Sequence, residues 1–90
     1  MLTISYTAKF KKDYRLVKKR GYDICLLEDV LEILCTDQQL PSKYHDHALS
    51  GDYAGYRECH ITADWLLIYK VRDTELILSL TRTGTHSDLF

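Results

Sequence analysis

The sequence predicts an α+β fold in which a helical hairpin packs on a mostly antiparallel four-stranded sheet, with the elements in the order β-α-α-β-β-β. Helical periodicity follows one short alternating segment, and three segments rich in aliphatic and aromatic residues come after it. Helices and strands that are segregated along a chain are typical of α+β domains. The 90 residues suffice for one core, so we expect a single domain over residues 1–90.

The first two predicted elements are a strand over Leu2–Tyr6 and a helix that ends at Gly21. Apolar and polar residues alternate in Leu2–Tyr6, which is the periodicity of a half-buried strand. Thr7 suits the N-cap of the helix, and Gly21 suits the position just after its end. Between them, apolar residues recur along one helical face: Phe10, Tyr14 and Val17.

A second helix is predicted after Asp23, which can cap it. The link at Gly21-Tyr22 is short, so we expect the two helices to form an antiparallel hairpin. Residues 36–41 break the second helix, and residues 42–54 have little periodicity and are expected to be a loop. The apolar stripe of this helix consists of Ile24, Leu27, Val30, Leu31 and Leu34.

Three strands complete the predicted fold as an antiparallel meander, and the partner of the first strand stays open. If the corners are two-residue turns at Thr62-Ala63 and Asp73-Thr74, one row across the sheet holds His60, Trp65 and Arg82. Neither corner has the Asn-Gly pair that fixes such a turn, so a slip of one residue would move these side chains to the other face. The three predicted strands are Tyr56–Ile61, Asp64–Arg72 and Glu75–Thr83.

Further reactive groups gather at the same end of the sheet, because Asp64 precedes Trp65 and His86 lies just beyond the last strand. RNA can be cut without a metal when a base takes the proton of its 2′-hydroxyl, an acid protonates the leaving 5′-oxygen and a cation binds the phosphate. Histidine can serve as acid or base, arginine donates paired hydrogen bonds to phosphate, and an indole offers a surface on which a nucleobase stacks.

The same residues also fit roles without chemistry. Arg82 and Asp64 can form a surface ion pair, Trp65 can belong to the core, and His60 can be an ordinary half-buried strand residue. We expect no metal and no cofactor, since His45 and His47 have no third ligand at a suitable spacing.

Positive charge is concentrated in the first helix. Residues 1–22 hold seven basic residues and one acid, a net charge of +6, whereas the rest of the chain holds five basic and twelve acidic residues, a net charge of −7. Such a separation is typical of an element that faces a polyanion. We therefore expect contacts to RNA or to the ribosome from Lys9, Lys11, Lys12, Arg15, Lys18, Lys19 and Arg20.

Cysteine content and hydropathy predict a cytoplasmic protein without a membrane partner. The first residues contain no signal-peptide stretch, and the longest apolar run, residues 65–69, is too short to cross a bilayer. The cysteines are odd in number and are expected to be reduced thiols, with Cys59 on the face of its strand opposite His60: Cys25, Cys35 and Cys59.

Three motifs carry a resemblance to a known family. Residues 46–61 are D-H-A-L-S-G-D-Y-A-G-Y-R-E-C-H-I, residues 64–70 are D-W-L-L-I-Y-K, and residues 82–90 are R-T-G-T-H-S-D-L-F. In this order and spacing they resemble the YafQ-type toxins of the RelE/ParE superfamily, and the basic first helix and the helical hairpin match as well. Two positions depart from the family. Ala48 replaces a common proline, which we expect to loosen the loop that holds His47, and Cys59 stands where a small or aliphatic residue is usual.

The resemblance implies a RelE-like fold and the toxin of a type II toxin–antitoxin system. Such a toxin is a metal-independent, ribosome-dependent endoribonuclease that cleaves mRNA in the A site and so inhibits translation. The implied partners are a cognate antitoxin of the ribbon-helix-helix type, the ribosome and mRNA, with operator DNA bound only through the antitoxin complex. The implied catalytic residues are His47, His60, Asp64, Arg82 and His86, and the implied substrate-binding residues are Trp65 and Phe90.

Roles within this set are expectations that the resemblance supplies. His86 would be the general acid, and Asp64 with His60 would form the base side. His47 would position or neutralise the transition state, and Arg82 would bind the phosphate. Trp65 would line the site, and Phe90 would close the leaving side. One alternative is a non-catalytic ParE-like inhibitor of another target such as gyrase, which has no need of these histidines and Asp64 together. Another is a small nucleic-acid-binding regulator that acts only within its antitoxin complex.

Overall fold

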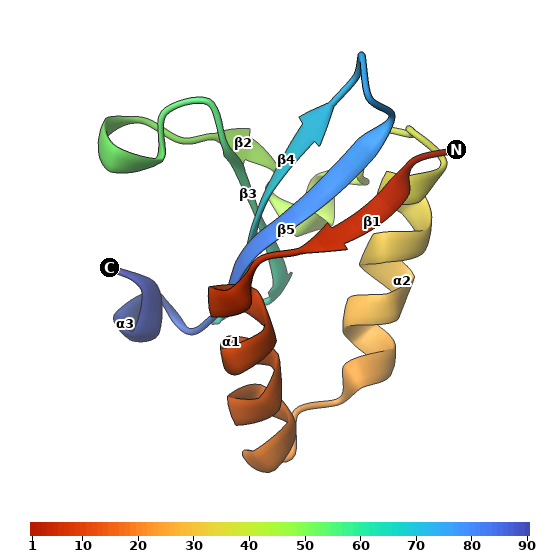
Figure 1. Cartoon of the computed structure of the whole chain (residues 1–90). Coiled ribbons are helices and arrows are strands. Elements are labelled where there is room, and N and C mark those ends of the chain that lie inside the picture. The colour runs from red at the N-terminus through yellow and green to blue at the C-terminus, as the bar shows by residue number, and fades with distance from the viewer.

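The structure, a computed structural model, describes all 90 residues and confirms the α+β class. Its elements are β1 (Thr3–Tyr6), α1 (Ala8–Lys19), α2 (Ile24–Cys35), β2 (His47–Ala48), β3 (Arg57–Thr62), β4 (Trp65–Arg72), β5 (Ile77–Gly84) and α3 (His86–Leu89), with 3₁₀ turns η1 (Ser42–Tyr44) and η2 (Gly51–Tyr53). The sheet has five strands in the order β1-β5-β4-β3-β2 rather than the expected four (Figure 1). The additional strand, β2, is two residues long and lies in the segment expected to be a loop.

The strand partners resolve what the sequence leaves open. β1 pairs in parallel with β5, and every other neighbouring pair of strands is antiparallel. β5 therefore lies inside the sheet, although it is the last strand in the chain. None of the three helices is long and apolar enough to cross a bilayer.

Both predicted helix caps are present. The hydroxyl of Thr7 accepts a hydrogen bond from the backbone N–H of Phe10 at 3.0 Å, and the carboxylate of Asp23 accepts one from the N–H of Cys25 at 3.0 Å. Gly21 has a φ of +84°, which suits glycine and explains why the chain turns between the two helices at this point.

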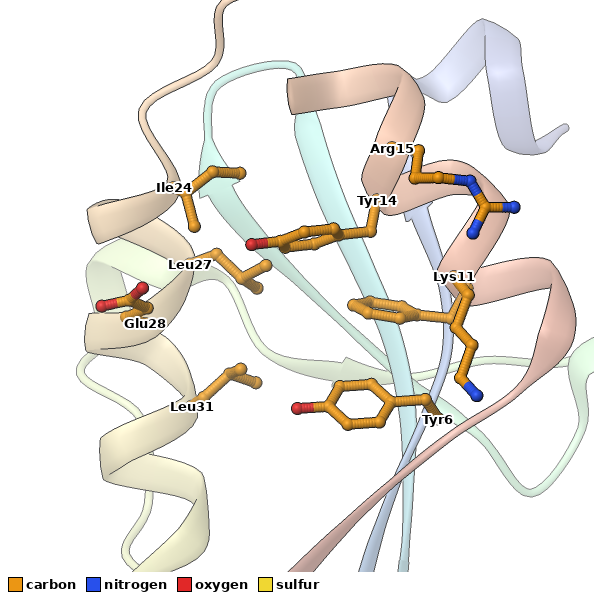
Figure 2. Close-up of a pocket in the computed structure, with 9 residues that line it drawn as sticks. Tyr6, Lys11, Tyr14, Arg15, Ile24, Leu27, Glu28 and Leu31 are labelled. Atoms are coloured by element: carbon orange, nitrogen blue, oxygen red, sulfur yellow. The ribbon is translucent and has the colours of Figure 1, made fainter. Parts of the chain in front are cut away.

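The two long helices cover one face of the sheet but leave a groove between them. A main core of 14 buried residues joins the sheet to α1 and α2, while a smaller buried cluster of Leu66, Ile68 and Leu89 marks the opposite face. Figure 2 shows aromatic rings from β1 and α1 facing aliphatic side chains from α2 across a cavity of about 420 Å³. A short link joins the two helices, as expected for a hairpin, but the helices diverge as they leave that link (Figure 1).

The register differs from the prediction because neither turn has the expected length or position. Trp65 pairs with Thr62, so the first corner is Ala63-Asp64. Arg72 pairs with Ile77, so the second turn has four residues, 73–76, and it places Leu76 at a φ of +54°. β-bulges follow in both strand pairs. The predicted pairing of Trp65 with Arg82 is therefore wrong.

Candidate active site

Four polar side chains share the face of the sheet opposite α1 and α2. The register pairs His47 of β2 with Glu58 of β3. Through Ile68 of β4, Glu58 is aligned in turn with Arg82 of β5. His60 is two residues along β3 from Glu58, so both side chains point to the same face. The sheet thereby gathers two imidazoles, a carboxylate and a guanidinium on one surface.

Glu58 is the buried carboxylate of this row, with 6% of its surface exposed. Its Oε1 lies 3.3 Å from Nε2 of His47 and 3.8 Å from Nε2 of His60. Its Oε2 is buried without a hydrogen-bond partner, which is costly for a carboxylate. Glu58 is not among the residues that the sequence predicts, although its spacing of two from His60 in a strand is a signal that could have found it.

His47 of β2 faces this carboxylate, and His45, two residues before it, lies beside His60. Nδ1 of His47 lies 2.7 Å from the carbonyl oxygen of His45, which can only accept, so Nδ1 carries a proton and donates it. This contact orients the ring and turns Nε2 toward Glu58. The ring of His45 meets that of His60 edge to face at 5.7 Å, beside a cavity of about 740 Å³.

An anchored aspartate holds the segment that carries His45 and His47 against the sheet. The carboxylate of Asp46 accepts hydrogen bonds from Nη2 of Arg57 at 3.0 Å and from the hydroxyl of Tyr69. Burial, together with the hydrogen bond to Asp46, raises the pKa of Tyr69 above its ordinary value. Because Asp46 lies between His45 and His47 in the chain, its bonds tie this segment to β3 and β4.

Arg82 is held by a carboxylate from helix α1. Its Nε lies 2.6 Å from Oδ2 of Asp13, and its Nη2 lies 3.2 Å from Oδ1 of the same residue. The side chain of Arg82 is 20% exposed. Its ion-pair partner is thus Asp13 and not Asp64, which was the alternative that the sequence offered.

The C-terminal helix carries the remaining predicted residues. Thr85 and Asp88 form a capping box at the start of α3. The backbone N–H of His86 donates to Oδ1 of Asp64 at 3.2 Å, which joins α3 to the corner between β3 and β4. The ring of Phe90 lies 5.0 Å from that of His86, so these two predicted residues are neighbours.

The start of α3 requires a glycine. A Cβ on Gly84 would lie 3.0 Å from Oδ2 of Asp88, closer than such atoms normally approach. Gly84 pairs with Leu66, which pairs in turn with His60, so these three residues are aligned across the sheet. Helix α3 begins two residues after Gly84. His86 therefore lies at the same end of the sheet as His60.

Trp65 does not line this site, and the expectation that it does is wrong. It is 2% exposed and belongs to the main core. Its Nε1 donates to the hydroxyl of Thr83 at 2.9 Å, and its ring meets that of Tyr22 edge to face at 5.1 Å. The physical reason is the shifted turn, which moves Trp65 to the helix-covered face.

All seven basic residues of the first helix and its end are exposed, but they differ in surroundings. Lys11 and Arg15 line the groove between α1 and α2, opposite Glu28 (Figure 2). Nη1 of Arg20 lies 2.7 Å from Oδ2 of Asp88, so this residue has a partner within the fold. The other basic residues of this set have no ion-pair partner: Lys9, Lys12, Lys18 and Lys19.

Comparison with known protein families gives one match that spans almost the whole chain. Residues 2–90 match the family described as bacterial toxin of type II toxin-antitoxin system, YafQ. The chain belongs to the YafQ family of bacterial toxins. The mRNA interferase toxin YafQ of Escherichia coli strain K12 is 41% identical to this YafQ-family toxin over 88 residues, which are 97% of this chain and 94% of the relative.

Solved structures of similar chains share the whole fold of this YafQ-family toxin. A metal-bound toxin from Helicobacter pylori is 46% identical, with a TM-score of 0.94 and complete coverage of both chains. A chain in the Escherichia coli DinJ-YafQ complex is 40% identical, with a TM-score of 0.90, and the alignment covers 100% of this chain and 99% of that one. The RelE-like expectation for the fold is confirmed, with the fifth strand as its correction.

The histidines of this YafQ-family toxin are not arranged as a metal centre. No group of three or more His, Cys, Asp or Glu side chains is placed to hold a metal ion. Cys59 is buried on the core side of β3, as expected, and burial raises its pKa to about 12, which leaves it protonated and unsuited to be a nucleophile. The imidazole and carboxylate groups of the site can perform acid–base chemistry.

Proposed function

We propose that this toxin is an mRNA interferase that cleaves mRNA in the ribosomal A site by attack of the RNA's own 2′-hydroxyl, without a metal. The observation that carries the proposal is the row of His47, Glu58 and Arg82 on one face, with His60 beside it. A base, a cation for the phosphate and imidazoles for proton transfer are what this reaction needs. Membership in the YafQ family supports the same activity.

The base side of the proposed reaction consists of Glu58 with His60. The carboxylate of Glu58 can accept the proton of the 2′-hydroxyl through His60, whose Nε2 lies 3.8 Å from its Oε1. Asp64, which the resemblance places on the base side, binds the backbone of His86 instead. In this proposal Glu58 takes over that role, and Asp64 positions α3.

The acid side of the proposed reaction lies at α3. The 2′-oxygen attacks phosphorus, the bond to the 5′-oxygen breaks, and His86 protonates that oxygen, which leaves a cyclic phosphate and a free 5′-hydroxyl. Arg82 binds the phosphate and His47 neutralises charge in the transition state. Phe90 stacks beside His86 and closes the leaving side.

The proposed partners are the ribosome, mRNA and an antitoxin of the ribbon-helix-helix type, with operator DNA bound only through the antitoxin. The unpaired lysines of α1 support docking on ribosomal RNA, where phosphate contacts position a protein without reading sequence. The similar YafQ chains of Escherichia coli that form a DinJ-YafQ toxin-antitoxin complex support an antitoxin.

Induced expression without any antitoxin tests the proposed activity. We expect the wild-type chain to arrest growth and to cut mRNA in phase with codons. His86→Ala and Glu58→Gln remove the acid and the base, so each should abolish both effects. Glu75→Gln is the matched control, since Glu75 is an exposed carboxylate in the turn between β4 and β5, and it should behave as wild type.

Two outcomes would contradict the proposal. Arrest that persists in His86→Ala with intact mRNA would point to a non-catalytic inhibitor of another target such as gyrase. Absence of arrest by the wild-type chain would point to a regulator that acts only with its antitoxin.

A further inference from the structure

We propose that Asp13 is a positioning residue of the active site, which holds Arg82 in the orientation that binds the scissile phosphate. The inference rests on the proposed function, in which Arg82 contacts that phosphate. This role makes helix α1 part of the active site, although α1 covers the face of the sheet opposite the row of His47, Glu58 and Arg82.

The contact between the two residues is bidentate and largely shielded from solvent. Oδ2 of Asp13 lies 2.6 Å from Nε of Arg82, and Oδ1 lies 3.2 Å from Nη2. The side chains of Arg82 and Asp13 are 20% and 13% exposed. Oδ2 of Asp13 also accepts the backbone N–H of Thr83 at 3.2 Å, so the carboxylate binds the side chain and the strand that carries it.

Asp13 occupies one edge of the Arg82 guanidinium and leaves another edge free. A guanidinium has five N–H donors, and Nε with Nη2 forms one of its two-donor edges. Asp13 takes this edge, so the N–H groups of Nη1 and the second N–H of Nη2 remain for a phosphate.

Because Asp13 holds one edge of the Arg82 guanidinium before the substrate binds, it affects catalysis. A free arginine has several rotatable bonds, and a substrate that orders them loses binding energy to conformational entropy. Asp13 orders them before RNA arrives, which is the preorganisation that stabilises a transition state. The effect should appear in kcat rather than in KM, because docking on the ribosome by α1 dominates binding in the proposed function.

A second ion pair from the same face of α1 fits this inference. Arg20 follows Asp13 by seven residues, or about two helical turns, so both lie on one side of α1. Arg20 binds Asp88 of α3, the helix that begins with His86. One face of α1 therefore holds both the arginine and the helix that carries the acid.

A double-mutant cycle tests the proposal. Purified wild-type chain, Asp13→Asn, Arg82→Ala and the double variant are compared for kcat and KM on programmed ribosomes, with a melting temperature for each. We expect Asp13→Asn to lower kcat on the order of tenfold with little change in KM. In the Arg82→Ala background the same substitution should change kcat by less than about twofold, since it acts through Arg82.

The matched control is Asp29→Asn, which removes an exposed carboxylate from α2 that has no ion-pair partner and should leave kcat unchanged. Equal losses from Asp13→Asn in both backgrounds would show an effect through stability alone and overturn the proposal. A higher kcat would mean that Asp13 shields Arg82 from phosphate and would overturn it as well. A wild-type chain that does not cleave would defeat the proposed function first, and the positioning role with it.

A second readout does not depend on activity. Hydrogen exchange of the Nε–H of Arg82, followed by NMR, should be slower than that of Arg72, which is exposed and has no carboxylate partner. Asp13→Asn should accelerate the exchange of Arg82 alone. Equal exchange at Arg82 and Arg72 in the wild-type chain would mean that the pair is not formed and would contradict the proposal.

Discussion

At the scale of single residues, Thr83 links strand β5 to β4 and to helix α1. Its hydroxyl donates to the carbonyl oxygen of Leu66 at 2.7 Å and accepts from Nε1 of Trp65 at 2.9 Å. Its backbone N–H donates to Asp13, the partner of Arg82. The hydroxyl and the backbone N–H of this buried position are therefore satisfied, and the strand that carries Arg82 is tied to both β4 and α1.

Trp65→Phe tests the assignment of Trp65 to the core. The substitution removes one buried hydrogen bond and part of the ring, so we expect the free energy of unfolding to fall by about 1–2 kcal/mol in urea denaturation. The cleavage rate well below the melting temperature should stay near that of the wild-type chain. A large loss of kcat at unchanged stability would instead place Trp65 at the substrate, as the sequence alone suggests.

The sequence could identify residue types and spacings but not the face on which each side chain lies. His60 and Glu58 are two apart within one strand, so their common face follows from any register. Trp65 and Arg82 are on different strands, and their relation depends on two turns without a diagnostic sequence and on two bulges. Contacts such as that of Asp13 with Arg82, 69 residues apart, have no local signal at all.

At the scale of elements, α3 depends on its neighbours for stability. A helix of four residues has almost no stability of its own. Its capping box, its hydrogen bond to Asp64 and the ion pair of Asp88 with Arg20 supply what it lacks. The hydrogen bond from Arg20, followed by that from the backbone of Thr85, lowers the pKa of Asp88 well below its ordinary value.

Arg20→Ala tests this support through the pKa of Asp88. Because the folded pKa is lowered, the contribution of Asp88 to stability is present above its unfolded pKa and is lost as the pH falls toward the folded pKa. Without Arg20, we expect the pKa of Asp88 to rise toward its ordinary value, so that α3 loosens at a higher pH than in the wild-type chain. A carbon-13 NMR titration of the Asp88 carboxyl measures this directly.

Lys19→Ala is the matched control for that titration, since Lys19 is the exposed neighbour of Arg20 and has no contact with Asp88. It should leave the pKa of Asp88 unchanged. Identical titrations in the wild-type chain and in Arg20→Ala would show that Arg20 does not support α3.

At the scale of the whole molecule, positive and negative charges lie in different parts of the fold. The net charge of −1 consists of a basic α1 on a domain that is otherwise acidic. Binding to a polyanion through such a helix releases counterions, so its affinity falls steeply as salt rises. The lysines that have no partner within the fold should carry this dependence, whereas Arg20 is already neutralised by Asp88.

Ribosome binding measured over a range of salt concentrations tests this difference. Lys12→Ala should reduce the slope of the logarithm of the binding constant against the logarithm of the salt concentration by about 1. Arg20→Ala should reduce it by much less. Binding that does not respond to salt would count against docking through α1.

The fold as a whole was more predictable than its connections. Caps, apolar stripes and strand segments are local patterns, and the structure confirms them at Thr7, Asp23 and the three later strands. β2 escapes prediction because two residues are too few to show periodicity, and its pairing depends on the Asp46 anchor. The partner of β1 is equally hidden, because a parallel neighbour leaves no pattern in a strand of four residues.

The pairing of β1 with β5 has a consequence for synthesis of the chain. Thr3 pairs with Ile77, so the first strand to be translated has no neighbour until residues more than seventy positions later have been added. At about 5–20 residues per second, that interval is on the order of ten seconds. During this time the nascent polypeptide lacks β5 and therefore Arg82. Strand order alone thus delays a finished active site in a protein whose proposed target is the machine that makes it.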